Sequence, residues 1–315
     1  MEQTSLILNQ VLPILLLLAL GGWIQHKKFL AETTIEDIRK MIVSFALPAI
    51  LFASFLTIEM KWVYAIIFGM VFLLCILLFL LGKVLGRKFF PQVAYFPYLI
   101  TGFEYGMLGV SLFGAAYGLE KIGVIAVVDL GHEIFIWFVF LPLLLIKRDG
   151  SQNPKMILWT FFSTPVVLAI LAGIGLNLLG VQKNLIQVPL VGGVMKTLEF
   201  LGDLAVPLIL IVVGYGIQIN QTGLGKAAAV VVLRLGLLIP LALMLNHFLI
   251  RSSLGLEKIF ETALFTLLIL PPPFILPLYT RANLESEEKQ YINNVLVLHT
   301  MISIGIFLVY FAMHQ

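Results

Sequence analysis

The sequence predicts an all-α polytopic membrane protein, and three observations support this fold class. Hydrophobic residues make up 60% of the 315 residues, charged residues make up only 12%, and the mean hydropathy is +1.05. Soluble domains carry about 25% charged residues, so this composition indicates an integral membrane protein. Apolar stretches of membrane-spanning length recur along the chain, and two of them are interrupted near their middles.

Ten hydrophobic stretches have the length of about 20 residues that a helix needs to cross a bilayer. The connections between them are short, and none has the composition of a soluble domain. We therefore expect ten transmembrane helices, near residues 5–25, 40–58, 62–82, 93–117, 122–146, 156–180, 198–218, 226–250, 259–280 and 292–313.

The distribution of Lys and Arg predicts the orientation of the chain. About thirteen of these residues lie in the connections after the odd-numbered stretches, and about six lie on the opposite side. Cytoplasmic loops carry the excess, so we expect both termini outside, in a protein of the cell membrane. The first apolar stretch follows no basic segment and is long enough to span, so we expect no cleavable signal peptide.

With this orientation the first five helices start outside and the last five start inside, which predicts two inverted repeats. Residues 46–51 resemble residues 205–210, each with a proline near mid-span, and residues 118–120 match residues 283–285. Two short matches in the right order favour a repeat. The expected halves are residues 1–146 and 147–315.

The two interrupted stretches lie at corresponding places in these halves. Residues 99–111 hold three glycines and the carboxylate of Glu104, and residues 270–277 hold four prolines. Proline removes a backbone donor and clashes with the preceding turn, so a continuous helix is not expected there. Non-helical backbone at membrane depth is tolerated where it is buried in protein or lines a wet cavity. Paired breaks of this kind indicate a transporter's binding site.

Glu104 is the most informative side chain. A charged group at the bilayer centre costs about 2.5–3.5 kcal/mol on insertion scales, so such residues are usually functional. Burial favours the neutral form of a carboxyl group, so Glu104 can carry a proton, bind a cation or contact the substrate. The alternative is a protonated residue that only joins two helices.

Helix 5 carries three further titratable residues on one face: Asp129, His132 and Glu133. They can relay protons or bind a cation, or Asp129 and His132 can form a neutral structural pair. No Cys or second His completes a tetrahedral set, so we expect no metal site.

Other polar residues within the spans have structural alternatives. Asp203 can pair with Lys196 or face a cleft, and we favour a structural role. Arg234 can bind a carboxylate substrate, but its place near a helix end favours snorkelling to the interface. Thr101 and Ser111 can satisfy backbone groups freed by the first break. In helix 10, Asn293 can cap the helix, and Asn294 and His299 are candidate site residues.

In these features the chain resembles the auxin efflux carrier family, which includes the plant PIN-formed carriers and bacterial malate or malonate permeases. The resemblance covers nearly the whole chain and rests on residues 11–14, Gly21 and Gly22, residues 46–52, the glycine-rich helix 4 and the proline-rich helix 9. It implies a bile-acid symporter-like fold in which helices 4 and 9 unwind and cross. It also implies a scaffold of helices 1, 2, 6 and 7, often dimeric, and a transport domain of helices 3–5 and 8–10.

The chain departs from the family at one motif. The family's fourth helix commonly reads Asn-x-Gly-x-x-Gly-x-Pro, where this chain has Glu104, Gly106, Gly109 and Ser111. A carboxylate there repels an organic anion unless it is protonated or holds a cation. We therefore expect proton or cation coupling through Glu104, with Asp129 as the second candidate.

The resemblance and the breaks together predict a secondary transporter of a small organic anion, a mono- or dicarboxylate. The alternatives are a cation/proton antiporter, a channel or a ligand-sensing receptor. Phosphate-loop, HExxH and CxxC motifs are absent, so we expect no enzyme, no cofactor and no nucleic-acid partner. The expected substrate- or ion-binding residues are Glu104, Gly106, Gly109, Ser111, Asp129, His132, Pro271, Pro272, Pro273, Pro277, Asn294 and His299.

Overall fold

The computed structural model of the chain describes residues 2–149, 159, 162–180, 189–217, 223–276 and 286–314, and these ranges contain helices and no strands. Seven helical segments are long and apolar enough to cross a membrane, which confirms an integral membrane protein. The ten-helix inverted repeat stays a prediction. The seven segments are Glu32–Thr57, Val63–Phe89, Phe96–Tyr117, Leu119–Arg148, Leu190–Gly216, Leu224–Ser253 and Gln290–His314.

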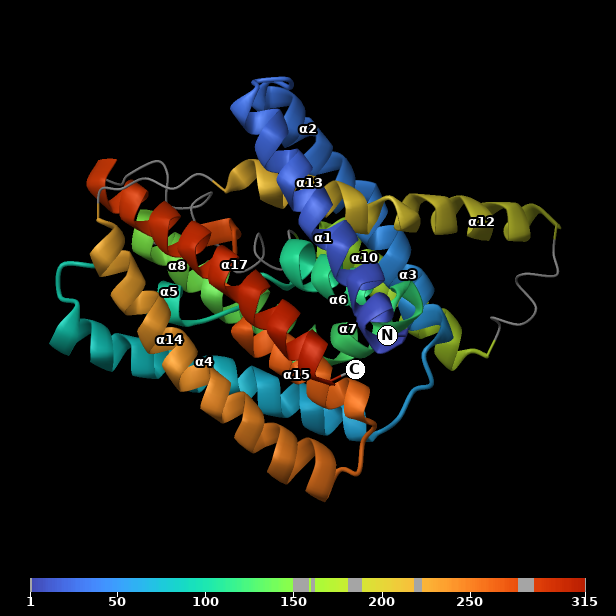
Figure 1. Cartoon of the computed structure of the whole chain (residues 1–315). Helices are drawn as coiled ribbons and strands as arrows, with labels where there is room; N and C mark the ends of the chain where they lie inside the picture. Colours follow the sequence, from blue (N-terminus) through green and yellow to red (C-terminus); the bar gives the residue numbers. More distant parts are fainter. Residues whose placement is uncertain are drawn as a thin grey trace.

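The N-terminal part of the chain is drawn in blue to green in Figure 1. Its helices are α1 (Glu2–His26), α2 (Glu32–Met41), η1 (Ile42–Ala46), α3 (Leu47–Thr57), α4 (Val63–Phe89), α5 (Phe96–Ile100), η2 (Tyr105–Gly109), α6 (Val110–Tyr117), η3 (Leu119–Lys121), α7 (Ile122–Phe135), η4 (Ile136–Phe140) and α8 (Leu141–Asp149). The second helical segment begins at Glu32, earlier than the hydrophobic stretch predicts, because the polar α2 continues directly into η1 and α3.

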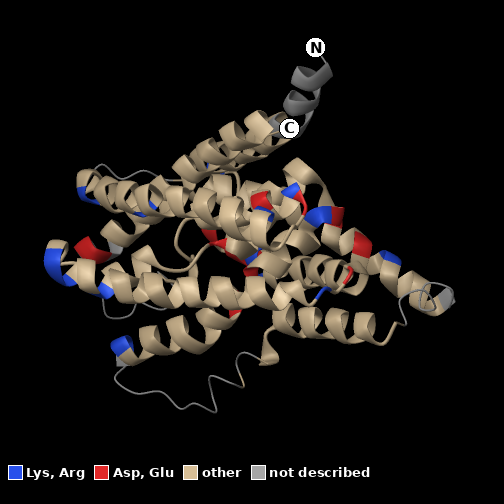
Figure 2. Ribbon diagram, turned by 90° about the horizontal axis from the view of Figure 1, so that it is seen from below, with Lys and Arg blue, Asp and Glu red and all other residues tan. Residues whose placement is uncertain are grey.

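The C-terminal part is drawn in yellow to red in Figure 1. Its described helices are α10 (Pro165–Leu178), α12 (Pro189–Asp203), α13 (Ala205–Gly216), α14 (Leu224–Leu245), η5 (Asn246–Ser253), α15 (Lys258–Ile269) and α17 (Ser286–His314). Most Lys, Arg, Asp and Glu residues lie towards helix ends, and a few lie within the bundle (Figure 2). Those few charged residues within the bundle are the candidates for functional side chains.

One group of helices packs through glycines. α1 packs on α13, and α3 packs on both α10 and α12. A Cβ atom on Gly21 would lie 2.1 Å from the carbonyl oxygen of Ile211, and one on Gly214 would lie 2.1 Å from that of Leu18. The backbones of α1 and α13 therefore touch, as is common where helices associate in a membrane.

A second group contains α4, α7, α14, α15 and α17, with α4 on α7 and α14 on both α15 and α17. In Figure 1, α4, α14, α15 and α17 lie together at the lower left, and α1, α3, α12 and α13 lie at the upper right. Contacts between the groups include α15 and α17 with α6 or η2, and α6 with α1 and α13. The interrupted segment that contains α6 therefore lies between the two groups.

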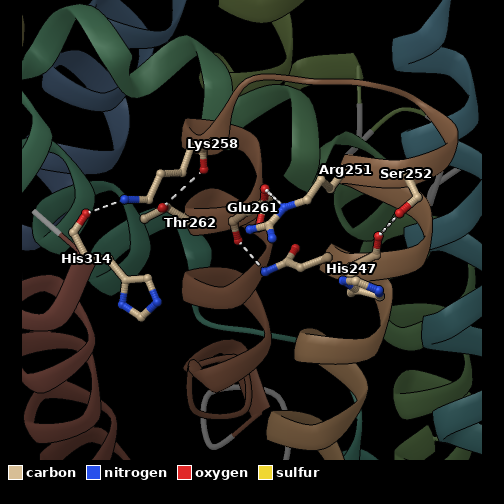
Figure 3. Close-up of polar contacts among 8 residues, drawn as sticks. His247, Arg251, Ser252, Lys258, Glu261, Thr262 and His314 are labelled. Carbon is tan, nitrogen blue, oxygen red and sulfur yellow. Dashed lines mark hydrogen bonds and ion pairs between the residues drawn. The ribbon is translucent and has the colours of Figure 1, made fainter.

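The ends of α14, α15 and α17 are joined by polar contacts, which Figure 3 shows. Arg251 makes a bidentate ion pair with Glu261, at 2.9 and 2.7 Å. Lys258 Nζ donates to the carbonyl oxygen of His314 at 2.8 Å. These contacts fix the connection between η5 and α15 and hold the start of α15 in place.

Candidate functional site

The two backbone interruptions lie in direct contact inside the bundle. Residues 101–104 separate α5 from η2, and residues 270–273 follow α15 without helical structure. The backbone N–H of Glu104 donates to the carbonyl oxygen of Pro271 at 2.8 Å. Gly102 has a φ of +75°, and a Cβ atom there would lie 2.7 Å from Pro273 Cγ. Only glycine combines this conformation with this close approach. We call the paired interruptions the crossover.

Glu104 connects the two interruptions through its side chain. One carboxylate oxygen accepts the backbone N–H of Met107 at 3.2 Å, and the other accepts that of Phe274 at 2.5 Å. Glu104 is only 8% exposed. It is the N-cap of η2, where free backbone amides favour an anion. The carboxylate therefore occupies the place where the crossover offers amides to an anion.

His132 supports the first interruption from α7. Its Nε2 accepts the backbone N–H of Phe103 at 2.8 Å, and its Nδ1 lies 2.8 Å from Asp129 Oδ1. Since the backbone N–H of Phe103 can only donate, the Nε2 atom of His132 carries no proton, and its Nδ1–H donates to Asp129. In this arrangement the imidazole is neutral and both of its nitrogens are engaged.

Glu133 completes a compact cluster with these two residues. Ligand atoms of Asp129, His132 and Glu133 lie within 4.8 Å of one another, and Trp137 Nε1 donates to Glu133 Oε2 at 3.0 Å. A metal ion bound by all three residues would break a hydrogen bond of His132. Two carboxyl groups this close favour sharing a proton over carrying two charges. The cluster is suited to holding protons.

Arg234 of α14 lies against the other side of the crossover. It is fully buried, so the snorkelling interpretation is wrong. Its guanidinium donates to the carbonyl oxygens of Leu99 (3.0 Å), Gly102 and Leu270 (3.2 Å), and it lies 5.1 Å from the centre of the Phe103 ring. This role could not be predicted from the sequence, because these carbonyls are free only where the backbone leaves the helix.

A cavity of about 560 Å³ extends from the crossover to the exposed start of α2. Four of the predicted site residues line it: Glu104, Gly106, His132 and Pro273. Its other charged lining residues among those described are Glu32, Glu36, Arg39 and Glu133, so the described lining holds four glutamates and one arginine. Arg39 is paired with Glu36 at 2.9 Å.

The other predicted site residues do not line this cavity. Ser111 donates its hydroxyl to the carbonyl oxygen of Leu108 inside the helix, and Thr101 Oγ1 has no hydrogen-bond partner in the described chain. The expectation is therefore wrong for Thr101, whereas the Ser111 hydroxyl does bond a backbone carbonyl within residues 99–111. The remaining ones form the buried surroundings of the crossover and of α7 and α17: Gly109, Asp129, Pro271, Pro272, Asn294 and His299. Pro277 lies outside the described residues.

The surroundings of Asp203 and the role of the polar helix α2 also differ from what the sequence predicts. Lys196 pairs with Glu199 at 2.8 Å, and Asp203 is exposed at the end of α12, away from the cavity. Sequence reasoning missed Glu32, Glu36 and Arg39, because they lie outside the hydrophobic stretch at residues 40–58. Asn293, Tyr215 and Thr300 also line the cavity. The amphipathic pattern of α2 is the signal that could have identified its three charged residues.

Comparison with known proteins adds one finding. A family model described as a membrane transport protein matches residues 6–315 of the chain. The search of curated proteins found no match to this chain. The matched range includes every residue of the cavity and of the crossover.

Proposed function

Because this chain belongs to the auxin efflux carrier family of membrane transport proteins, we propose that it carries a small organic anion and couples its movement to protons through Glu104. The substrate class is a mono- or dicarboxylate. The observation that carries this proposal is the position of the Glu104 carboxylate on two backbone amides at the wall of the cavity.

An organic anion and the ionised Glu104 side chain compete for the same place. The amides of Met107 and Phe274 are the anion-binding groups of the crossover, and Glu104 occupies both. Protonation makes the carboxyl group a weaker acceptor and removes its repulsion of a second anion. Protonation and substrate binding therefore favour one another, and a carboxylate crosses together with a proton.

The charged groups around Glu104 fit proton coupling. From α7, His132 and Glu133 line the same cavity as Glu104, and His132 is hydrogen-bonded to Asp129. From α2, the cavity receives Glu32, Glu36 and Arg39. Arg39 is the single cation in the described lining, and its charge is balanced by Glu36. The ionised carboxylates of the lining therefore repel an anion, and this repulsion is removed when the carboxyl groups bind protons.

The packing supports movement of one helix group against the other. The cavity lining includes residues of α3 and α13 from the first group, residues of α7 and α17 from the second group, and residues of the crossover. We propose that the first group, with α1, α10 and α12, is a scaffold that forms a homodimer, and that the second group moves in a rocking or elevator motion. In this proposal the protein lies in the cell membrane with both termini outside.

The test is uptake of radiolabelled malate, malonate, lactate and indole acetate into proteoliposomes under an imposed pH gradient. We expect a proton gradient to drive uptake by the wild-type protein. Glu104→Gln should abolish gradient-driven uptake while counterflow of the same substrate persists. Glu199→Gln is the matched control and should behave as the wild type, because Glu199 is exposed, pairs with Lys196 and does not line the cavity. Unchanged pH dependence in Glu104→Gln would contradict the proposal, and so would failure of all organic acids to be transported.

A cation/proton antiporter is the second candidate, because four glutamates and one arginine line the described cavity. An acidic cavity concentrates cations. Adding sodium, lithium or potassium to acid-loaded proteoliposomes would then release protons without any organic acid. Proton release under these conditions would favour this candidate, and its absence would exclude it.

A further inference from the structure

The guanidinium of Arg234 is bound where a helix interruption would otherwise offer its carbonyls to a free cation. We infer that Arg234 takes the place of a coupling metal cation at the crossover, so that transport by this protein requires no sodium, potassium or other metal ion. This inference deepens the proposed function, on which it rests, by excluding metal cations as the coupling ion.

The carbonyl groups that Arg234 contacts come from both interruptions. Leu99 lies in the last turn of α5, Gly102 follows the C-cap Thr101 of that helix, and Leu270 is the C-cap of α15. The last carbonyls of a helix have no partner within the helix and carry its partial negative charge. In the membrane interior such ends are the places where transporters bind coupling cations. A single arginine neutralises two of these ends together.

The charge of Arg234 depends on these carbonyls. No carboxylate in the described ranges lies within ion-pair distance of it, and its side chain is fully buried. A buried cation without counter-charge is very unfavourable, so the carbonyls and the face of the Phe103 ring supply the stabilisation. Arginine suits this position because its planar fork points several donors in fixed directions.

The nearby carboxylates are engaged by N–H donors as well. Both oxygens of Glu104 accept backbone amides, one oxygen of Asp129 accepts His132, and one oxygen of Glu133 accepts Trp137. A metal cation needs several oxygen atoms that point at one position. The crossover instead directs its carbonyls at Arg234. A proton needs only one oxygen, so it is the coupling ion that this arrangement admits.

The first experiment uses the wild-type protein. Its melting temperature and its rate of substrate counterflow are measured in sodium, lithium, potassium and choline chloride at equal ionic strength. A bound ion present at about a hundred times its Kd would raise the melting temperature by several degrees. We expect the same values in all four salts. A saturable rise with one metal cation, or uptake driven by its gradient, would overturn the inference.

The second experiment removes the tethered cation and returns it in solution. Arg234→Ala should lower the melting temperature by at least about 5 °C, and methylguanidinium should restore at least half of the loss and the counterflow rate. The matched control is Arg251→Ala, which removes a guanidinium whose side chain is 61% exposed and paired with Glu261. It should show no such recovery. Stability of Arg234→Ala equal to the wild type, or a loss that methylguanidinium does not reverse, would contradict the inference. If this variant does not fold, the wild-type salt comparison decides.

The two proposals fail in different ways. A specific sodium effect on the wild type would overturn the role of Arg234 and leave organic anion transport untouched. Unchanged pH dependence in Glu104→Gln would overturn proton coupling, whereas the salt comparison and the methylguanidinium recovery measure Arg234 independently of the substrate.

Discussion

Gly21 and Gly22 are adjacent in α1 and offer a direct test of how closely α1 and α13 pack. A Cβ atom on Gly21 would lie 2.1 Å from the carbonyl oxygen of Ile211, whereas one on Gly22 would lie 3.8 Å from that of Gly214. Ordinary contact begins at 3.4 Å, so Gly21→Ala must separate the two backbones by about 1.3 Å, which is 3.4 minus 2.1. No rotamer change can relieve this clash, because both atoms in contact are held by backbone.

The expected difference in stability between Gly21→Ala and Gly22→Ala follows from this geometry. Overpacking a well-packed site costs about 1–3 kcal/mol, and a backbone clash belongs at the upper end. Both variants gain about 1 kcal/mol of helix propensity, so that gain cancels in the comparison. At about 2 °C for each kcal/mol, Gly21→Ala should melt about 6 °C below Gly22→Ala.

The assay is thermal denaturation of both purified variants in the same detergent, followed by the loss of the monodisperse peak in size-exclusion chromatography. Gly22→Ala should melt at or slightly above the wild-type temperature. Equal melting temperatures for the two variants would refute the close approach of α1 and α13.

Three further predictions concern other contacts, and thermal denaturation measures each of them. His132→Ala leaves the buried N–H of Phe103 without an acceptor, so it should cost about 1–3 kcal/mol; a wild-type melting temperature would contradict this. Asn177→Leu removes an amide whose Nδ2 lies 2.7 to 3.0 Å from three carbonyl oxygens at the end of α3 and shares its two hydrogens among them, so it should cost a similar amount; an unchanged melting temperature would contradict this. Gly131→Ala should destabilise, since its Cβ would lie 2.2 Å from the carbonyl oxygen of Phe68, whereas Gly236→Ala, with no atom within 4 Å, should not; the reverse order would refute the packing of α4 on α7.

The sequence predicts the positions of the two interruptions and the residue between them, because glycine, proline and a carboxylate are conspicuous within apolar stretches. The same reasoning singles out Glu104, and in the structure its carboxylate accepts the backbone amides of Met107 and Phe274. The positions of helices follow from hydropathy in the same way. The number of crossings, the inverted repeat and the site assignment stay predictions.

Other parts of the site could not be predicted, because they depend on which backbone groups are left without partners. Arg234 is nearer to one end of the span predicted at residues 226–250, which favours snorkelling, but it lies in the middle of α14 and its contacts are up to 135 positions away in the chain. Similarly, the polar α2 reads as a loop by hydropathy, but it continues the second helical segment and carries three charged residues to the cavity. In both cases the tertiary contact, and not the local pattern, determines the role of the residue.

The bonds of the crossover also bear on how the protein is made. The carboxylate of Glu104 accepts an amide 170 positions further along the chain, and the guanidinium that covers Leu99 and Gly102 lies more than 130 positions after them. When the ribosome has completed α8, the interruption at residues 101–104 is therefore in the membrane without these partners. Unpaired backbone groups are costly in lipid. The N-terminal half must consequently stay shielded by the insertion machinery, or remain incompletely packed, until α14 and α15 arrive.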